Sequence, residues 1–299
     1  MSNARCILFT DRGGFERHVE RFKPTLNCRW IASAAEASDV PNAPFLQLVD
    51  AGGDSSAITW GERSRHAGKL AVSYLEAASA AALGHHIDAI VTAPVSKESI
   101  SPHFKGQTDF LAERAGCTQY AMSFFAPTFK VVLATVHLPL REALERITST
   151  GYLDLIRFVD DQLRRFRFTD RRIAIAGINP HAGEGGMFGR EELDVLSHAV
   201  KQASSEGISV SGPHSADSLY YRAHTGEFDV VIAPYHDQGL IPVKLIAHGS
   251  ATNVTLGLPY VRTSPDHGTA FSIAGQGVAD ASGMTAALTC AIDLVRKIG

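Results

Sequence analysis

Three histidines stand where a folded α/β protein would place ligand-binding groups. His137, His181 and His236 each lie at or just past the carboxyl end of a run rich in Val, Ile and Ala. Side chains at the carboxyl ends of parallel strands line the crevice in which such sheets bind ligands. Three converging imidazoles would hold a divalent metal ion with open positions for water or substrate. Their spacing matches no local metal motif, so three unrelated loop histidines remain the alternative.

Two acidic residues lie near these histidines in the sequence. Asp237 follows His236 directly, and Asp217 ends the segment Gly-Pro-His-Ser-Ala-Asp. Either carboxylate could orient an imidazole or bind the metal itself, and solvated loop acids are the alternative. The chain has no G-x-G-x-x-G fingerprint, so a nucleotide cofactor would need another cradle.

A second group of residues carries the donors needed to bind an anion. Lys244, Asn253 and Arg262 supply an ammonium, an amide and a guanidinium, which together can clamp a phosphate or a carboxylate. The stretch 106–109 (Gly-Gln-Thr-Asp) is predicted to open a helix, where backbone N–H groups bind anions. Lys97 follows another predicted strand and adds a cation. Ordinary surface charges are the alternative for each residue taken alone.

The elements that must position these residues are short apolar strands alternating with amphipathic helices. The predicted strands are Cys6–Thr10, Phe45–Val49, Ala89–Thr92, Val131–Val136, Ile173–Ala176 and Val230–Ala233. The predicted helices are Ser64–Leu83, Tyr152–Phe166, Glu191–Ser205 and Gly283–Lys297. This alternation predicts an α/β fold with largely parallel sheets and flanking helices. We expect residues 1–299 to form one catalytic unit of two interleaved lobes, with the active site in the cleft between them.

Composition excludes several classes of protein. The chain has 299 residues, is 45% hydrophobic and carries a formal net charge of −3. That balance fits a soluble globular protein and argues against nucleic-acid binding, which needs a basic excess. No apolar stretch is long enough for a membrane span, and no signal peptide is expected. Four scattered cysteines fit reduced thiols in a cytoplasmic protein.

Five sequence blocks form a specific pattern: Ala134–Leu140, Gly177–Gly186, Tyr235–Gly239, Asn253–Pro259 and Asp266–Ala270. They resemble the 4-hydroxythreonine-4-phosphate dehydrogenase family of vitamin B6 biosynthesis. The resemblance extends over about two-thirds of the chain, from Val91 to Gly299. The resemblance implies an α/β fold similar to isocitrate and isopropylmalate dehydrogenases. It also implies a homodimer with active sites at the lobe cleft and near the dimer interface.

The resemblance assigns roles to individual residues. His137, His181 and His236 match metal-ligand positions, with one ligand coming from the neighbouring subunit. Zn²⁺, Co²⁺ or Mn²⁺ suits such a site better than Mg²⁺. The substrate-binding candidates are Gln107, Thr108, Lys244, Asn253 and Arg262. The segment His267, Gly268, Thr269 and Ala270 resembles the loop that receives the adenosine end of NAD or NADP, and Lys97 and Asp237 are the candidate catalytic residues.

Two departures from the family pattern bear on the substrate. Gln107 stands where the family usually has His, and Thr10–Gly14 replaces a Gly-Asp-Pro-rich turn. The expected reaction is metal-dependent, NAD(P)-linked oxidation, with decarboxylation, of 4-phosphooxy-L-threonine or a related phosphorylated hydroxy acid. Three alternatives remain: a dehydrogenase of a phosphorylated sugar acid, a dehydrogenase of an aromatic cis-dihydrodiol, and a non-catalytic metabolite-binding relative.

Overall fold

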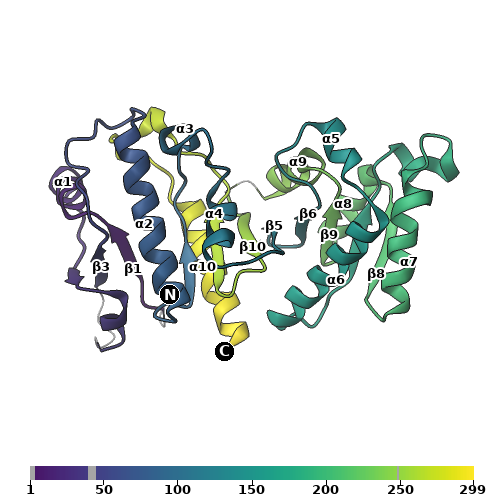
Figure 1. The fold of residues 1–299 in the computed structure, drawn as a ribbon, viewed down its shortest axis with the longest axis horizontal. Coiled ribbons are helices and arrows are strands. Elements are labelled where there is room, and N and C mark those ends of the chain that lie inside the picture. Colours follow the sequence, from purple (N-terminus) through teal and green to yellow (C-terminus); the bar gives the residue numbers. More distant parts are fainter. Residues whose placement is uncertain (1–3, 40–44, 248) are drawn as a thin grey trace. The chain divides into compact units, whose positions relative to one another are not determined.

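The computed structural model describes residues 4–39, 45–247 and 249–299 (Figure 1). The chain divides into two compact units, each built from two separate segments. Unit 1 comprises Met1–Thr118 and Leu258–Ile292, and unit 2 comprises Gln119–Gly257 and Asp293–Gly299.

Unit 1 contains two groups of parallel strands. Strands β1 (Ile7–Thr10), β3 (Leu46–Asp50) and β2 (Cys28–Ile31) pair in that order. Strand β4 (Ala89–Val91) pairs with β11 (Val261–Pro265). The helical elements are α1 (Arg12–Phe22), η1 (Ala34–Asp39), α2 (Arg65–Leu83), α3 (Lys97–Ile100), α4 (Gln107–Arg114), η4 (Phe271–Ile273) and α10 (Ser282–Ile298), whose last turns belong to unit 2.

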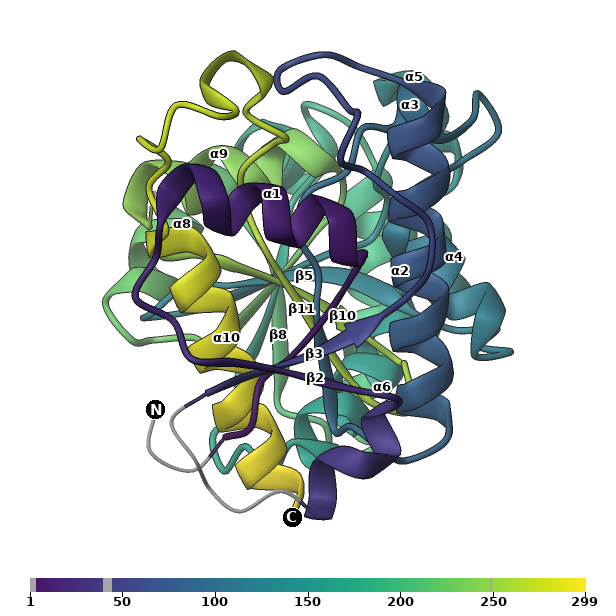
Figure 2. The ribbon, with the colours of Figure 1, turned by 90° about the vertical axis from the view of Figure 1, so that its left-hand side faces the viewer.

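Helix α1 packs its arginines on both tryptophans of the chain. The Arg12 guanidinium lies 4.4 Å from the ring centroid of Trp30, and that of Arg17 lies 4.2 Å from the ring centroid of Trp60. Arg21 Nε donates a 3.0 Å hydrogen bond to the carbonyl of Gly275. Figure 2 shows α1 beside the yellow-green segment that contains this carbonyl. The Arg21 hydrogen bond therefore joins α1 to the segment between β11 and α10.

Unit 2 is a mixed sheet with helices. Its strand order is β10-β5-β6-β9-β7-β8, with β6, β9, β7 and β8 parallel and with β5 antiparallel to both β10 and β6. The strands are β5 (Ala121–Phe125), β6 (Lys130–Leu133), β7 (Ile173–Ala176), β8 (Val210–His214), β9 (Val230–Ala233) and β10 (Thr252–Leu256). The helical elements are α5 (Leu140–Glu145), α6 (Ser149–Arg165), η2 (Pro180–Gly186), η3 (Glu192–Leu196), α7 (Ser197–Ser205), α8 (Ala216–His224) and α9 (His236–Ile246).

Burial explains why these segments fold as they do. Every residue of β7 and β9 is buried, as expected for continuous apolar strands covered on both faces. Helix α6 begins at the cap Thr148, whose hydroxyl accepts from Gly151 N, and buries the predicted apolar stripe. That stripe comprises Leu153, Ile156, Val159, Leu163 and Phe166.

The predicted fold class is confirmed: the protein is α/β, with mostly parallel strands and flanking helices. Each predicted strand and helix is present, with ends that differ by a few residues. The segment predicted as one helix over Glu191–Ser205 instead begins with the π-helical turn η3 and continues as α7. Among the described residues, no helix is both long and apolar enough to cross a membrane.

Candidate functional site

The three predicted metal ligands follow three adjacent strands of unit 2. Strand β9 lies between β6 and β7 and is parallel to both. His137 follows β6, His236 begins α9 directly after β9, and His181 lies in η2 after β7. Because the strands are parallel, their carboxyl ends share one edge of the sheet. The three histidines therefore follow strands that are neighbours in the sheet.

Two hydrogen bonds that sequence reasoning missed join the loops at this edge. Thr135 Oγ1 donates a 2.7 Å bond to Pro234 O, which ties the segment after β6 to the segment after β9. Gln238 Nε2 donates a 2.8 Å bond to Gly177 O, which ties α9 to the segment after β7. Both donors lie within the sequence blocks that carry the family resemblance, and that is the signal that could have found them.

His137 and His236 lie close together at this edge. Their ring centroids are 5.6 Å apart. His236 Nδ1 lies 2.7 Å from Asp237 Oδ1. A carboxylate only accepts hydrogen bonds, so the proton is on Nδ1 and the lone pair of Nε2 is available to a ligand. Asp237 therefore contacts His236 through this hydrogen bond.

His181 occupies the neighbouring loop. Its ring centroid lies 6.1 Å from that of Phe188. Asp217 has a pKa below its ordinary value, mainly because Ser215 Oγ donates to it, with a smaller contribution from His181. Over the described part of the chain, no three His, Cys, Asp or Glu side chains form a group that could hold a metal ion. The structure therefore pairs His137 with His236 and places His181 on the adjacent loop.

Arg262 is the centre of a second group of predicted residues, within unit 1. Its side chain is buried, with 3% of the residue exposed. Its Nη2 donates to Thr92 Oγ1 at 2.7 Å and to Gln107 Oε1 at 3.2 Å, and its Nη1 donates to Thr108 Oγ1 at 3.4 Å. Burial lowers the pKa of Arg262 to about 10, so the guanidinium stays protonated at neutral pH. The structure thus joins three of the predicted anion-binding residues and adds Thr92, which sequence reasoning missed.

Both polar atoms of the Gln107 side-chain amide form hydrogen bonds. Its Oε1 accepts from Arg262, and its Nε2 donates a 3.1 Å bond to Ala93 O. Helix α4 begins at Gln107, as the sequence predicted. Lys97 begins α3, and its Nζ lies 3.5 Å from the position that a Cβ on Gly106 would take. Lys97 therefore lies beside the N-terminus of α4.

The remaining predicted site residues lie on α9, on β10 and in the segment that follows β11. Lys244 belongs to α9 and Asn253 to β10, both in unit 2, where Asn253 is in register with Phe124 of β5. In unit 1, His267 Nδ1 donates a 2.9 Å bond to Gly268 O. Ala270 has a left-handed backbone conformation, with a φ of 49°. Thr269 lies between Gly268 and Ala270 in the sequence.

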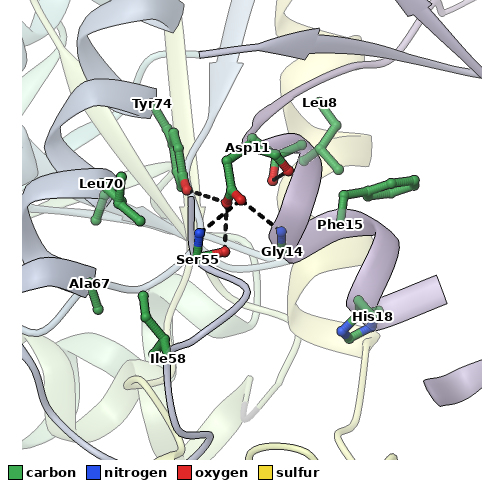
Figure 3. A pocket seen from close by; sticks show the side chains of 12 residues that line it. Leu8, Asp11, Gly14, Phe15, His18, Ser55, Ile58, Ala67, Leu70 and Tyr74 are labelled. Carbon is green, nitrogen blue, oxygen red and sulfur yellow. Dashed lines mark hydrogen bonds between the residues drawn. The ribbon is translucent and has the colours of Figure 1, made fainter. Parts of the chain in front are cut away.

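A cavity of about 430 Å³ lies in unit 1, between α1, α2, β1 and the segment after β3 (Figure 3). Leu8, Phe15, Ile58 and Leu70 supply its main apolar walls. None of the residues predicted from the sequence to bind metal, substrate or cofactor lines it.

The polar wall of this cavity is built on Asp11. The carboxylate accepts hydrogen bonds from Gly14 N (2.7 Å), Ser55 N (2.9 Å), Ser55 Oγ (2.6 Å) and Tyr74 Oη (2.5 Å). Burial alone would raise its pKa, but these bonds outweigh burial and lower it to about 2. A Cβ on Gly14 would lie 1.8 Å from Ser55 Oγ, so a larger residue there would displace the hydroxyl that donates to Asp11. The turn is therefore an internally bonded cap for α1.

The fold belongs to a known class of dehydrogenase structures. The β-decarboxylating dehydrogenase of Thermococcus kodakarensis superposes with a TM-score of 0.53 at 15% identity, covering 97% of this chain and 83% of that one. This likeness concerns the fold alone. The crystal structure of 4-hydroxythreonine-4-phosphate dehydrogenase from Klebsiella pneumoniae superposes with a TM-score of 0.86 at 34% identity, covering 97% of this chain and 90% of that one.

Sequence comparison places the chain in one family. The family model of the pyridoxal phosphate biosynthetic protein PdxA matches residues 2–291, and the chain belongs to this family, as its motifs predicted. A 4-hydroxythreonine-4-phosphate dehydrogenase of Beijerinckia indica is 45% identical over 211 residues, which span 70% of this chain and 63% of that protein. A D-threonate 4-phosphate dehydrogenase of Pectobacterium atrosepticum is 38% identical over 275 residues, 91% of this chain and 84% of that one.

Proposed function

We propose that this protein is a metal-dependent, NAD(P)-linked dehydrogenase that oxidises a CH–OH group of 4-phosphooxy-L-threonine or a closely related phosphorylated hydroxy acid. Membership of the PdxA family and the names of its relatives support a dehydrogenase acting on a phosphorylated hydroxy acid. The observation that carries the proposal is the placement of His137, His236 and His181 after three adjacent parallel strands.

The donor set fits a divalent transition metal. Imidazole nitrogens suit Zn²⁺, Co²⁺ or Mn²⁺ better than Mg²⁺, and the Asp237 hydrogen bond presents Nε2 of His236 for coordination. His137, His181 and His236 would hold the ion, one of them supplied by the second subunit of a homodimer. A bound ion of this kind supplies Lewis acidity, which favours ionisation of the substrate hydroxyl and stabilises enolate charge after loss of CO₂.

The residues around Arg262 would bind the anionic part of the substrate. The guanidinium keeps its charge at neutral pH and is oriented by Thr92, Gln107 and Thr108. Fixed geometry suits Arg to two-point binding of phosphate or carboxylate. Lys244 and Asn253 would add an ammonium and an amide donor from unit 2.

The cofactor and the proton carriers complete the proposal. The segment from His267 to Ala270 would receive the adenosine end of NAD or NADP, whose nicotinamide accepts the hydride. Lys97 and Asp237 would move the hydroxyl proton and protonate the carbon that loses CO₂. The products would be the reduced cofactor, CO₂ and a phosphorylated amino ketone.

A second candidate substrate is a phosphorylated sugar acid. The Pectobacterium relative, which covers 91% of this chain, is named for D-threonate 4-phosphate. Gln107 is uncharged at a position beside Arg262, which changes the charge presented to a substrate but leaves a phosphate clamp in place.

An assay of NAD(P)H formation tests the proposal. The purified protein, loaded with Zn²⁺, Co²⁺ or Mn²⁺, is given 4-phosphooxy-L-threonine, D-threonate 4-phosphate or an aromatic cis-dihydrodiol. We expect turnover with one phosphorylated acid and its loss after chelation. Turnover of the dihydrodiol alone, or ligand binding without reduction of either nucleotide, would contradict the proposal.

A further inference from the structure

The loop that carries His181 has a backbone that needs outside support. Residues 181–185 all have positive φ: 53°, 51°, 78°, 41° and 67° in order. Three of the five, His181, Ala182 and Glu184, are not glycine. A left-handed conformation is unfavourable for a non-glycine residue, so such a run persists only when surrounding contacts hold it.

Glu192 supplies those contacts from the next element. Its Oε1 accepts two hydrogen bonds of 2.7 Å, from Ile178 N and Asn179 N. Its Oε2 accepts a 3.0 Å bond from Asn179 Nδ2. Only 2% of Glu192 is exposed. Hydrogen bonds to a carboxylate are stronger than those between neutral groups, so this acid fixes the start of the loop firmly.

The loop closes tightly around the Glu192 carboxylate. A Cβ on Gly183 would lie 2.7 Å from Glu192 Oε2, so the backbone two residues after His181 passes directly against the acid. Glu192 is also the first residue of the π-helical turn η3, a form of helix that often occurs at functional sites. The carboxylate therefore contacts the loop both before and after His181.

We infer that Glu192 is a positioning residue that holds His181 in place for its role at the strand ends. Its oxygens are engaged by three N–H donors, so it acts through the backbone and does not serve as a metal ligand. The link to metal binding rests on the proposed function, whereas the support of the loop does not depend on it.

Hydrogen exchange measures the loop directly, without metal, substrate or cofactor. Glu192→Ala should speed amide exchange at residues 178–186, most at Ile178 and Asn179. Glu192→Gln keeps one oxygen for the two backbone donors and should restore most of the protection. Glu206→Gln, at an exposed acid paired with Arg157, is the control and should leave the loop unchanged. Where the Ala variant does not fold, Glu192→Asp shortens the reach and should show the same faster exchange.

Metal affinity, measured by competition of Zn²⁺ with a chromophoric chelator, tests the role of the loop. The Ala variant should bind Zn²⁺ about 10–100-fold more weakly than the wild type, as expected when a group that orients a ligand is removed. Unchanged exchange in the Ala and Asp variants, or unchanged Zn²⁺ affinity despite a mobile loop, would overturn the inference. Faster exchange in a protein whose wild type binds no Zn²⁺ would support the loop contact and refute the proposed function instead.

Discussion

The hydroxyl of Thr92 accepts a 2.7 Å hydrogen bond from the buried guanidinium of Arg262. Both residues are almost fully buried, and the pairing of β4 with β11 brings them together: Thr92 N donates to Thr263 O at 3.0 Å. A polar group just past one strand thus orients a cation on its neighbour. This contact should therefore affect both the stability of unit 1 and the anion binding that we propose for Arg262.

Removing the hydroxyl should reveal both roles. Thr92→Val keeps the shape but deprives a buried donor of its acceptor, which costs about 1–3 kcal/mol of unfolding free energy. The KM for the phosphorylated substrate should rise while kcat changes little. Urea denaturation and steady-state kinetics measure the two effects. Thr128→Val, at an exposed threonine, is the control, and equal stability of both variants would contradict the prediction.

Gln107→His should make the KM for the phosphorylated substrate depend on pH in a way that the KM of the wild type does not. The positive charge of Arg262 holds the pKa of a nearby imidazole below its ordinary value of about 6.5. Protonation adds positive charge, so the KM of the variant relative to wild type should fall as the pH drops below about 6. Titration of the substrate phosphate affects both KM values equally, so it does not change their ratio. Gln107→Met is the matched control. A KM ratio for Gln107→His that does not change with pH would contradict the placement of residue 107 beside the substrate anion.

His181→Ala should abolish turnover and leave the fold intact. Loss of a metal ligand exceeds the effect of losing a group that orients one, so we expect at least about a 100-fold decrease in kcat/KM. Circular dichroism checks the fold, and metal analysis checks occupancy. The control is His224→Ala, at an exposed histidine that contacts Thr128. Near-normal activity of the metal-free His181→Ala variant would contradict the proposed metal-dependent mechanism.

Asp11 should stabilise the protein in a pH-dependent manner. Its folded pKa of about 2 lies below the reference value of 3.8. The stabilisation is therefore fully present above about pH 4 and is lost as the pH falls from 4 towards 2. Asp11→Asn should lower the unfolding free energy by about 2 kcal/mol at pH 7, and the difference should shrink below pH 4. Asp161→Asn, at an exposed acid of α6, is the control; a difference independent of pH would contradict this account.

The sequence predicted strands best where their burial is complete. The segments Ile173–Ala176 and Val230–Ala233 are uninterrupted apolar runs, and their predicted bounds match β7 and β9. By contrast, β8 has the sequence Val-Ser-Gly-Pro-His, and Gly and Pro usually mark turns. Proline is tolerated there because β8 is the last strand of its sheet in unit 2. A local pattern does not reveal which strand lies at an edge.

The candidate site was predictable where one residue type carries the chemistry. Histidines after apolar runs identified the three loops, and a cluster of donors identified Arg262. Thr92, Thr135 and Glu192 were not predicted, because each acts through one hydrogen bond or a few whose partners are far apart in sequence. Glu192 in particular stands in a Glu-Glu pair that resembles any exposed helix start, and the sequence alone does not distinguish it from the exposed Glu191.

The placement of the aromatic side chains has a practical consequence. Trp30 and Trp60, the two tryptophans of the chain, both belong to unit 1, and each packs against an arginine of α1. Tryptophan fluorescence therefore reports on the unfolding of unit 1 and not on that of unit 2, which contains His137, His181 and His236. Comparing emission with far-ultraviolet dichroism during denaturation would show whether the halves melt together or in succession.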